Sequence, residues 1–148
     1  MKAIYALAAF GVTVSGPALA KDPDPLFQSS DVIRITFKGA VGSASDTPRP
    51  GSIIIGNETL PMTFTERGIT RRKSDICSFP PLRVTFTQPP PETSLFAKQK
   101  RLKLVTHCRG GTDFQQYALL EYAAYKMYNR LTPVSYGARL AMIDYVAD

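Results

Sequence analysis

The chain has 148 residues, of which 44% are hydrophobic and 20% charged, with a formal net charge of +6 at pH 7. This composition is that of a globular protein and argues against wholesale disorder. A moderate positive excess suits anionic partners such as phosphate, nucleic acid or membrane lipid, but charge alone does not choose among them.

The first 20 residues have the pattern of an export signal. Lys2 gives a positive start, residues 3–14 are apolar in the main, and Ala18 and Ala20 place small side chains at a cleavage site. The alternative is a membrane anchor, but the apolar run falls short of the roughly 20 residues that span a bilayer. We therefore expect cleavage after Ala20, a periplasmic or secreted location, and a mature chain of 128 residues without a transmembrane segment.

The mature chain fits one domain and leaves no room for a second. Residues 21–30 are rich in Pro and Asp and are interpreted as a mobile lead-in, so the domain is placed at 31–148. Residues 32–38 alternate apolar and polar side chains and predict a strand. Residues 52–55 and 60–64 predict a second hairpin around a Gly-Asn turn, and Pro61 favours either an edge position or a late start for its strand.

Two further strands are predicted on either side of a proline-rich turn. Residues 82–86 and 102–106 alternate in the same way, and the segment 88–94 between them cannot continue a strand. A symmetric hairpin then places Cys77 opposite Cys108 at its open end. In an exported protein such a pair is expected to form a disulfide, and closing a loop of about 32 residues should stabilise the fold by roughly 3–4 kcal/mol.

Two other uses of these cysteines stay open, namely free thiols and a metal or nucleophile site with His107. A structural zinc site needs four ligands, and the chain has only two cysteines and one histidine. His107 is next to Cys108, and neighbours on a strand point to opposite faces, so the imidazole is badly placed to activate that thiol. No metal site and no catalytic residue are therefore predicted.

A helix is predicted from Thr112, as N-cap of a capping box with Gln115, to about Leu131. Its apolar side chains recur at helical spacing and are expected to pack on the sheet. This stripe consists of Tyr117, Leu120, Ala124, Met127 and Leu131. Residues 136–146 follow Pro133 and are interpreted as a last strand, with a short helix as the alternative. The fold class is therefore α+β, with a mainly antiparallel sheet of hairpins packed on one long amphipathic helix.

Two basic clusters could together form an anion-binding surface. The alternative is that they are solvated charges which keep strand edges from associating. The clusters are Arg71, Arg72 and Lys73 before the first cysteine, and Lys98, Lys100, Arg101 and Lys103 in the hairpin.

From Arg67 onwards the chain contains a series of short motifs, namely Arg67-Gly68, Arg71-Arg72, Cys77, Phe79-Pro80-Pro81-Leu82, Leu102-Lys103-Leu104-Val105-Thr106-His107-Cys108, Glu121-Tyr122, Tyr125, Asn129, Leu131-Thr132 and Arg139-Leu140. Together they resemble the pattern of an uncharacterised family of exported Gram-negative proteins. That family is similar, more distantly and at the level of fold alone, to the N-terminal lobe of the spore-coat CotH-type atypical kinases. The chain departs from the family pattern at Gly137, where an arginine is usual.

The resemblance implies a nucleotide site in which a strand lysine holds phosphates and pairs with a helix glutamate. Lys103 and Glu121 stand in that order, with Arg83 or Lys100 as other partners for the glutamate. Mg-ATP would be the cofactor by family analogy only. The catalytic carboxylate and metal ligands of such kinases belong to a second lobe, so the chain is expected to be the N-terminal part of a longer kinase-like protein. The other hypothesis is a disulfide-stapled binding or structural module whose basic hairpin meets an anionic ligand or surface.

Overall fold

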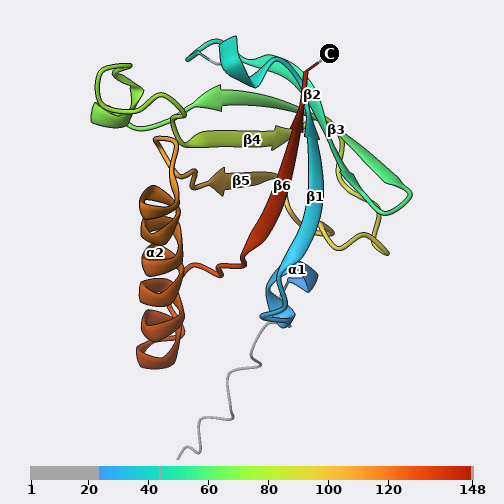
Figure 1. The fold of residues 1–148 in the computed structure, drawn as a ribbon. Coiled ribbons are helices and arrows are strands. Elements are labelled where there is room, and N and C mark those ends of the chain that lie inside the picture. The colour runs from blue at the N-terminus through green and yellow to red at the C-terminus, as the bar shows by residue number, and fades with distance from the viewer. Residues whose placement is uncertain (1–23, 44, 148) are drawn as a thin grey trace, which may run out of the picture.

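The computed structural model describes residues 24–43 and 45–147, so the predicted signal peptide at 1–20 and its cleavage site at Ala20 lie outside the described part. One strongly curled sheet and one long helix make up the fold (Figure 1). The elements in chain order are α1 (Pro25–Gln28), β1 (Ile33–Lys38), the 3-10 helix η1 (Val41–Ser43), β2 (Arg49–Ile55), β3 (Glu58–Glu66), the 3-10 helix η2 (Thr70–Arg72), β4 (Leu82–Phe86), β5 (Arg101–Leu104), α2 (Thr112–Leu131) and β6 (Ala141–Val146).

The six strands lie in the order β5-β4-β3-β2-β1-β6. All neighbours are antiparallel except β1 and β6, which pair in parallel from Ile33 opposite Ala141 to Lys38 opposite Val146. The parallel pair arises because the chain crosses from β5 through α2 before it re-enters the sheet beside β1. The predicted α+β class with a mainly antiparallel sheet is confirmed.

The core lies on the inner, concave face of the sheet. Alternate residues of each strand point to this face, as the period of a strand requires. Phe37 of β1, Phe64 of β3 and Leu82 of β4 have at most 1% of their surface exposed. The rings of Phe37 and Phe64 meet edge to face with their centroids 5.2 Å apart. This contact packs β1 against β3 across the inside of the curled sheet.

The structure places Pro61 differently from the prediction. Its strand, β3, is an interior strand between β2 and β4 rather than an edge. The backbone of Pro61 faces the β4 side at a point just beyond the last residue of β4. The missing N–H therefore removes no hydrogen bond from the pairing of β3 with β4. There the carbonyl oxygen of Pro61 accepts hydrogen bonds from the backbone N–H and the hydroxyl of Thr87, both at 3.1 Å.

The predicted hairpin with the two cysteines at its open end is confirmed. Strands β4 and β5 pair antiparallel with Leu82 opposite Leu104, and Cys77 and Cys108 form a disulfide beyond the ends of both strands, with Cα atoms 4.8 Å apart. Thr106 adds a buried side-chain bond, from its hydroxyl to the carbonyl of Phe79 at 2.6 Å. The disulfide and this hydrogen bond therefore both hold the open end of the hairpin.

A row of rings closes the curled sheet at this same end. Tyr145 of the edge strand β6 packs against Phe37 and, across the curl, against Phe79 before β4, with centroids 5.6 and 4.9 Å apart. Phe79 in turn stacks on His107 at 5.3 Å. Within residues 24–43 and 45–147, β6 pairs only with β1, so aromatic packing is what holds this edge strand to the disulfide end of the hairpin.

Helix α2 ends at Leu131 as predicted, but two expectations about it are wrong. Its N-cap is Gly111 rather than Thr112, and no side chain caps it. The apolar stripe that was expected to pack on the sheet is exposed, with Leu120 at 64% and Leu131 at 80%, and no residue of α2 is buried. The half-buried face of the helix carries Ala118, Tyr122 and Tyr125 instead, along with Glu121.

This second series also has helical spacing, so the sequence offers two candidate faces. The connections at the two ends of α2 select between them. Arg109 fixes the start by donating to the carbonyls of Ile76 and Asp75, at 2.6 and 2.7 Å. Near the other end, the ammonium group of Lys126 bonds the hydroxyl of Ser30 at 3.1 Å. The rotation of the helix is therefore set by tertiary contacts.

Part of the segment interpreted as a mobile lead-in is attached to the domain. Residues 25–28 form α1, and Leu26 is 5% exposed within the core. The carboxylate of Asp24 accepts a bond from the side-chain amide of Gln99 at 2.8 Å. This attachment brings the start of the described chain beside the segment that follows α2.

Packing against Phe37 and Phe79 partly buries the phenol of Tyr145, 37% of whose surface stays exposed, and this desolvation raises its pKa from 10.0 to about 12. The contact is therefore testable by pH. Between pH 10 and 12 the unfolded chain has lost the phenolic proton and the folded one keeps it, so the free energy of unfolding must fall with rising pH. Tyr145→Phe keeps the ring and removes this proton. We expect urea titrations at pH 8 and pH 11 to show a smaller loss of stability in Tyr145→Phe than in the wild type. Equal losses in the two proteins would contradict this assignment.

Candidate functional site

A cleft of about 540 Å³ opens between the two edge strands of the curled sheet. One wall is the inner face of the sheet, with Ile33, Ile35 and Val84 among its side chains. The other wall is the half-buried face of α2 together with the segment 135–141 that leads into β6. The cleft exists because β5 and β6 do not pair with each other and α2 covers the gap without inserting a side chain deeply into it.

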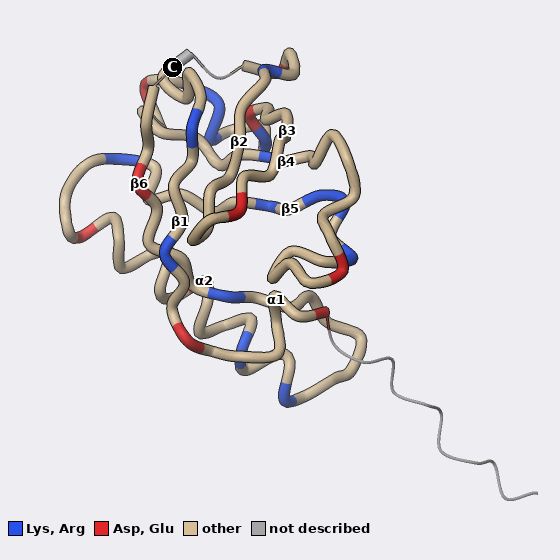
Figure 2. The backbone as a smooth tube through the Cα atoms, turned by 90° about the vertical axis from the view of Figure 1, so that its right-hand side faces the viewer, with Lys and Arg blue, Asp and Glu red and all other residues tan. Residues whose placement is uncertain are grey.

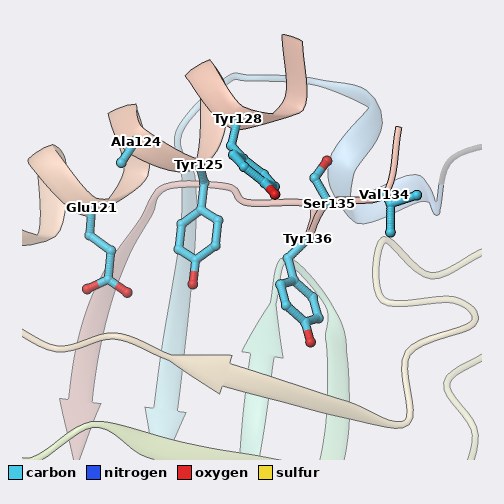
Figure 3. A pocket seen from close by; sticks show the side chains of 7 residues that line it. All are labelled: Glu121, Ala124, Tyr125, Tyr128, Val134, Ser135 and Tyr136. Atoms are coloured by element: carbon cyan, nitrogen blue, oxygen red, sulfur yellow. The ribbon is translucent and has the colours of Figure 1, made fainter. Parts of the chain in front are cut away.

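The cleft continues into a shallow depression of about 740 Å³ along α2. Figure 3 shows Glu121 and Tyr125 descending from the helix on the same side as Tyr136 from the following segment. These three residues line both hollows. The entrance of the cleft is therefore framed by two phenol rings and one carboxylate.

The segment between α2 and β6 is held by hydrogen bonds from two residues. The side-chain amide of Asn129 donates to the hydroxyl of Ser135 at 2.7 Å and to the carbonyl of Tyr136 at 2.9 Å. The guanidinium group of Arg139 donates to the carbonyls of Asp31 at 2.8 Å and Leu26 at 3.1 Å. These bonds fix the position of Tyr136 at the entrance.

Lys103 and Glu121, which the resemblance pairs, both line the cleft. They do not form an ion pair in the structure. The ammonium group of Lys103 lies over the ring of Tyr136, 4.4 Å from its centroid, where a cation–π contact contributes about 0.5–1 kcal/mol at an exposed site. The structure thus brings the two residues to one cleft and gives the lysine an aromatic partner.

Arg83, the other predicted partner, lies directly opposite Lys103 in the register of β4 and β5. Arg101 lies two residues before Lys103 on the same face, opposite Thr85. We call Arg83, Arg101 and Lys103 the basic strand face. Their positions alternate with the inward-facing leucines of the hairpin, and the side chains of Arg101 and Lys103, on the edge strand β5, also line the cleft. Figure 2 shows the basic positions along β5. Among the described residues, no carboxylate is within 4.0 Å of any of these three cations.

The two predicted basic clusters lie at opposite ends of the hairpin. Lys98 and Lys100 are exposed just before β5, beside the last residue of β4, since the backbone N–H of Phe86 bonds the carbonyl of Lys100. Arg71, Arg72 and Lys73 lie in and after η2, on the side where β4 begins. Arg72 is also 3.8 Å from the carboxylate of Asp46. The clusters do not merge into one surface.

The described part of the chain holds no group of three or more His, Cys, Asp and Glu side chains that could bind a metal ion. Cys77 and Cys108 are joined to each other, and His107 is stacked on Phe79. Over the same residues, no helix is both long and apolar enough to cross a bilayer.

Sequence reasoning did not single out Tyr136, Arg67 or Arg139 as site residues, although all three line the cleft. Tyr136 lies in an irregular segment without periodicity, so no pattern could point to it. Arg67 and Arg139, like Asn129, belong to the family pattern that the sequence resembles, which was the one signal for them. Comparison with family models, with curated proteins and with solved structures finds no match to this chain.

Gly137 lies at the cleft, in close contact with Phe27 of α1. A Cβ atom added to Gly137 would be 2.5 Å from Cγ of the Phe27 ring, whereas one added to Gly110 would meet nothing within 4 Å. The arginine that the resemblance places at this position would not fit beneath that ring. Gly137 therefore allows α1 and the segment before β6 to touch.

We expect Gly137→Ala to lower the free energy of unfolding by about 1 kcal/mol, the lower end of the range for overpacking, because position 137 is itself exposed and the added Cβ meets the Phe27 ring. Gly110→Ala is the matched control and should change stability by less than about 0.5 kcal/mol, as surface substitutions do. Urea denaturation of both variants at pH 7 makes the comparison. If the two variants lost the same stability, the Phe27 contact would not be the reason for glycine here.

Proposed function

We propose that this protein is an exported, disulfide-stapled binding module that takes up an anionic ligand at its basic strand face. The observation that carries the proposal is the cross-strand pair of Arg83 and Lys103. Like charges directly opposite each other on neighbouring strands destabilise a sheet. An oxyanion between them replaces this repulsion by charge-assisted hydrogen bonds from both side chains.

The alternative role of such charges, protection of a strand edge, accounts for only part of this face. Arg101 and Lys103 belong to β5, which is an edge strand and gains from exposed cations. Arg83 belongs to β4, whose both sides are paired with other strands. It has no edge to protect, so its position opposite Lys103 favours a ligand.

Export is part of the proposal. The residues of the proposed signal, with cleavage after Ala20, have the positive start, apolar stretch and small residues that export requires. The Cys77–Cys108 disulfide is compatible with the oxidising periplasm or cell exterior. A chain that is exported in this way would meet its ligand outside the cytoplasm.

Inorganic tripolyphosphate is the probe for the basic strand face. We expect Arg83→Gln/Lys103→Gln to weaken its binding at least tenfold in isothermal titration calorimetry, because each lost charge-assisted bond costs about 1.5–3 kcal/mol. Arg71→Gln/Lys73→Gln removes the same charge from the other end of the hairpin and should change affinity less than about twofold. Equal weakening by both pairs, or no binding by the wild type, would refute the site.

A second candidate function is favoured by one observation: Lys103 on a strand and Glu121 on the next helix line the same cleft. In this candidate the chain is the N-terminal portion of a CotH kinase-like protein. Lys103 would hold the phosphates of Mg-ATP, and Glu121 would orient the lysine once it leaves the ring of Tyr136. Catalysis would also need a catalytic carboxylate and metal ligands, which such kinases carry in a second lobe.

Mg-ATP separates the two candidates. If the kinase-like function holds, Mg-ATP at 100 times its dissociation constant should stabilise the fold by about 2.7 kcal/mol, and Glu121→Gln should weaken this binding while leaving tripolyphosphate binding intact. Asp113→Asn removes a carboxylate from the first turn of the same helix and is the control. Identical ATP affinity in the wild type and Glu121→Gln would exclude the glutamate from a nucleotide site.

A further inference from the structure

We infer that the ligand is a single-chain amphiphile, whose apolar chain enters the cleft between the sheet and α2 and whose anionic head lies at the basic strand face. This inference rests on the proposed function, because it adds an apolar tail to the anion proposed there. Lys103 connects the two parts, since it lies on that face and also lines the cleft.

The wall of the cleft is apolar in its depth. Ile33, Ile35, Val84, Leu102 and Ile143 line it from four different strands, and none of these side chains carries a polar atom. The volume of about 540 Å³ is within the range of about 300–1,000 Å³ that is usual for ligand sites. These side chains offer an apolar surface to a hydrocarbon chain, while polar and charged side chains make up the rest of the lining.

Helix α2 covers the cleft without filling it. Ala118 has the smallest side chain among the residues of α2 that line the cleft, and no residue of α2 is buried. Tyr122 and Tyr125 present rings toward the cleft. Rings with a polar tip suit the border between an apolar interior and water, which is where the neck of an amphiphile would lie.

The charges at the entrance select an anionic head over a cationic one. Arg67, Arg101 and Lys103 line the cleft, and among the described residues none of them has a carboxylate within 4.0 Å. The acidic residues of the lining are Glu121 and Asp24, and the Asp24 carboxylate already accepts a bond from Gln99. The cationic side chains that are free of a carboxylate therefore outnumber the acidic ones, which favours an anionic head group.

Monodecyl phosphate, kept below its micelle concentration, is the probe for this inference. We expect it to bind at least 100-fold more tightly than inorganic phosphate in isothermal titration calorimetry, because each buried methylene strengthens binding about fourfold. Decyl maltoside has the same chain and a neutral head, and it should bind at least tenfold more weakly than decyl phosphate. Equal binding of the two detergents would overturn the pairing of tail and anionic head.

Substitutions on α2 locate the tail. Ala118→Phe fills the cleft and should weaken decyl phosphate at least tenfold while tripolyphosphate binding is unchanged. Ala123→Phe adds the same ring at an exposed position of the same helix and should alter neither affinity more than about twofold. Ala118→Leu is the smaller replacement should the phenylalanine prevent folding. If Ala123→Phe weakened decyl phosphate as much as Ala118→Phe or Ala118→Leu, the effect would not come from the cleft and the inference would fail.

The same titrations distinguish the anion site from the amphiphile. Tripolyphosphate binding that depends on Arg83 and Lys103, with decyl phosphate no tighter than inorganic phosphate, would overturn the amphiphile and leave the anion site standing. If neither tripolyphosphate nor decyl phosphate bound, both the anion site and the amphiphile would be overturned. Decyl phosphate that binds only as micelles would also overturn the cleft, because the site as described accepts one chain.

Discussion

The contact between Tyr145 and Phe79 is the interaction on which the shape of the molecule depends. It joins the edge strand β6 to the segment that the Cys77–Cys108 disulfide ties to β5. The two edges of the sheet are thus brought together at one end by packing and a covalent bond, with no ladder between them. A sheet closed in this way at one end stays open elsewhere along its edges.

The opening is where α2 lies, and the helix is held there mainly through its ends. Arg109 anchors the start of α2 to the carbonyl of Ile76, next to Cys77. Asn129 anchors the turn that follows the end of α2. Since these bonds lie outside the helix–sheet interface, the helix can cover the cleft without burying its own side chains. The same arrangement leaves the apolar stripe of Leu120, Met127 and Leu131 in solvent.

The charges follow from the register of the hairpin. Leu82 opposite Leu104 places every second residue inward, so Arg83 and Lys103 occupy opposite positions between these inward residues. The ammonium group of Lys103 lies over the ring of Tyr136, and this contact offsets part of the repulsion between Lys103 and Arg83. Asn129 holds Tyr136 at the cleft. The basic strand face, where we propose an anion binds, and the cleft therefore share two residues, Arg101 and Lys103.

Local chemistry determined the strands of the hairpins, the disulfide, the end of α2 and the α+β class, because alternation, turn residues and Pro133 act over a few residues. The sequence by itself could not decide which of two helical stripes faces the sheet, where the interior proline strand lies, or that β6 pairs in parallel with β1. Those outcomes depend on contacts between residues far apart in the chain, such as Arg139 with Leu26 or Gly137 with Phe27. The cleft has the same origin, since it is the space between elements whose positions no local pattern encodes.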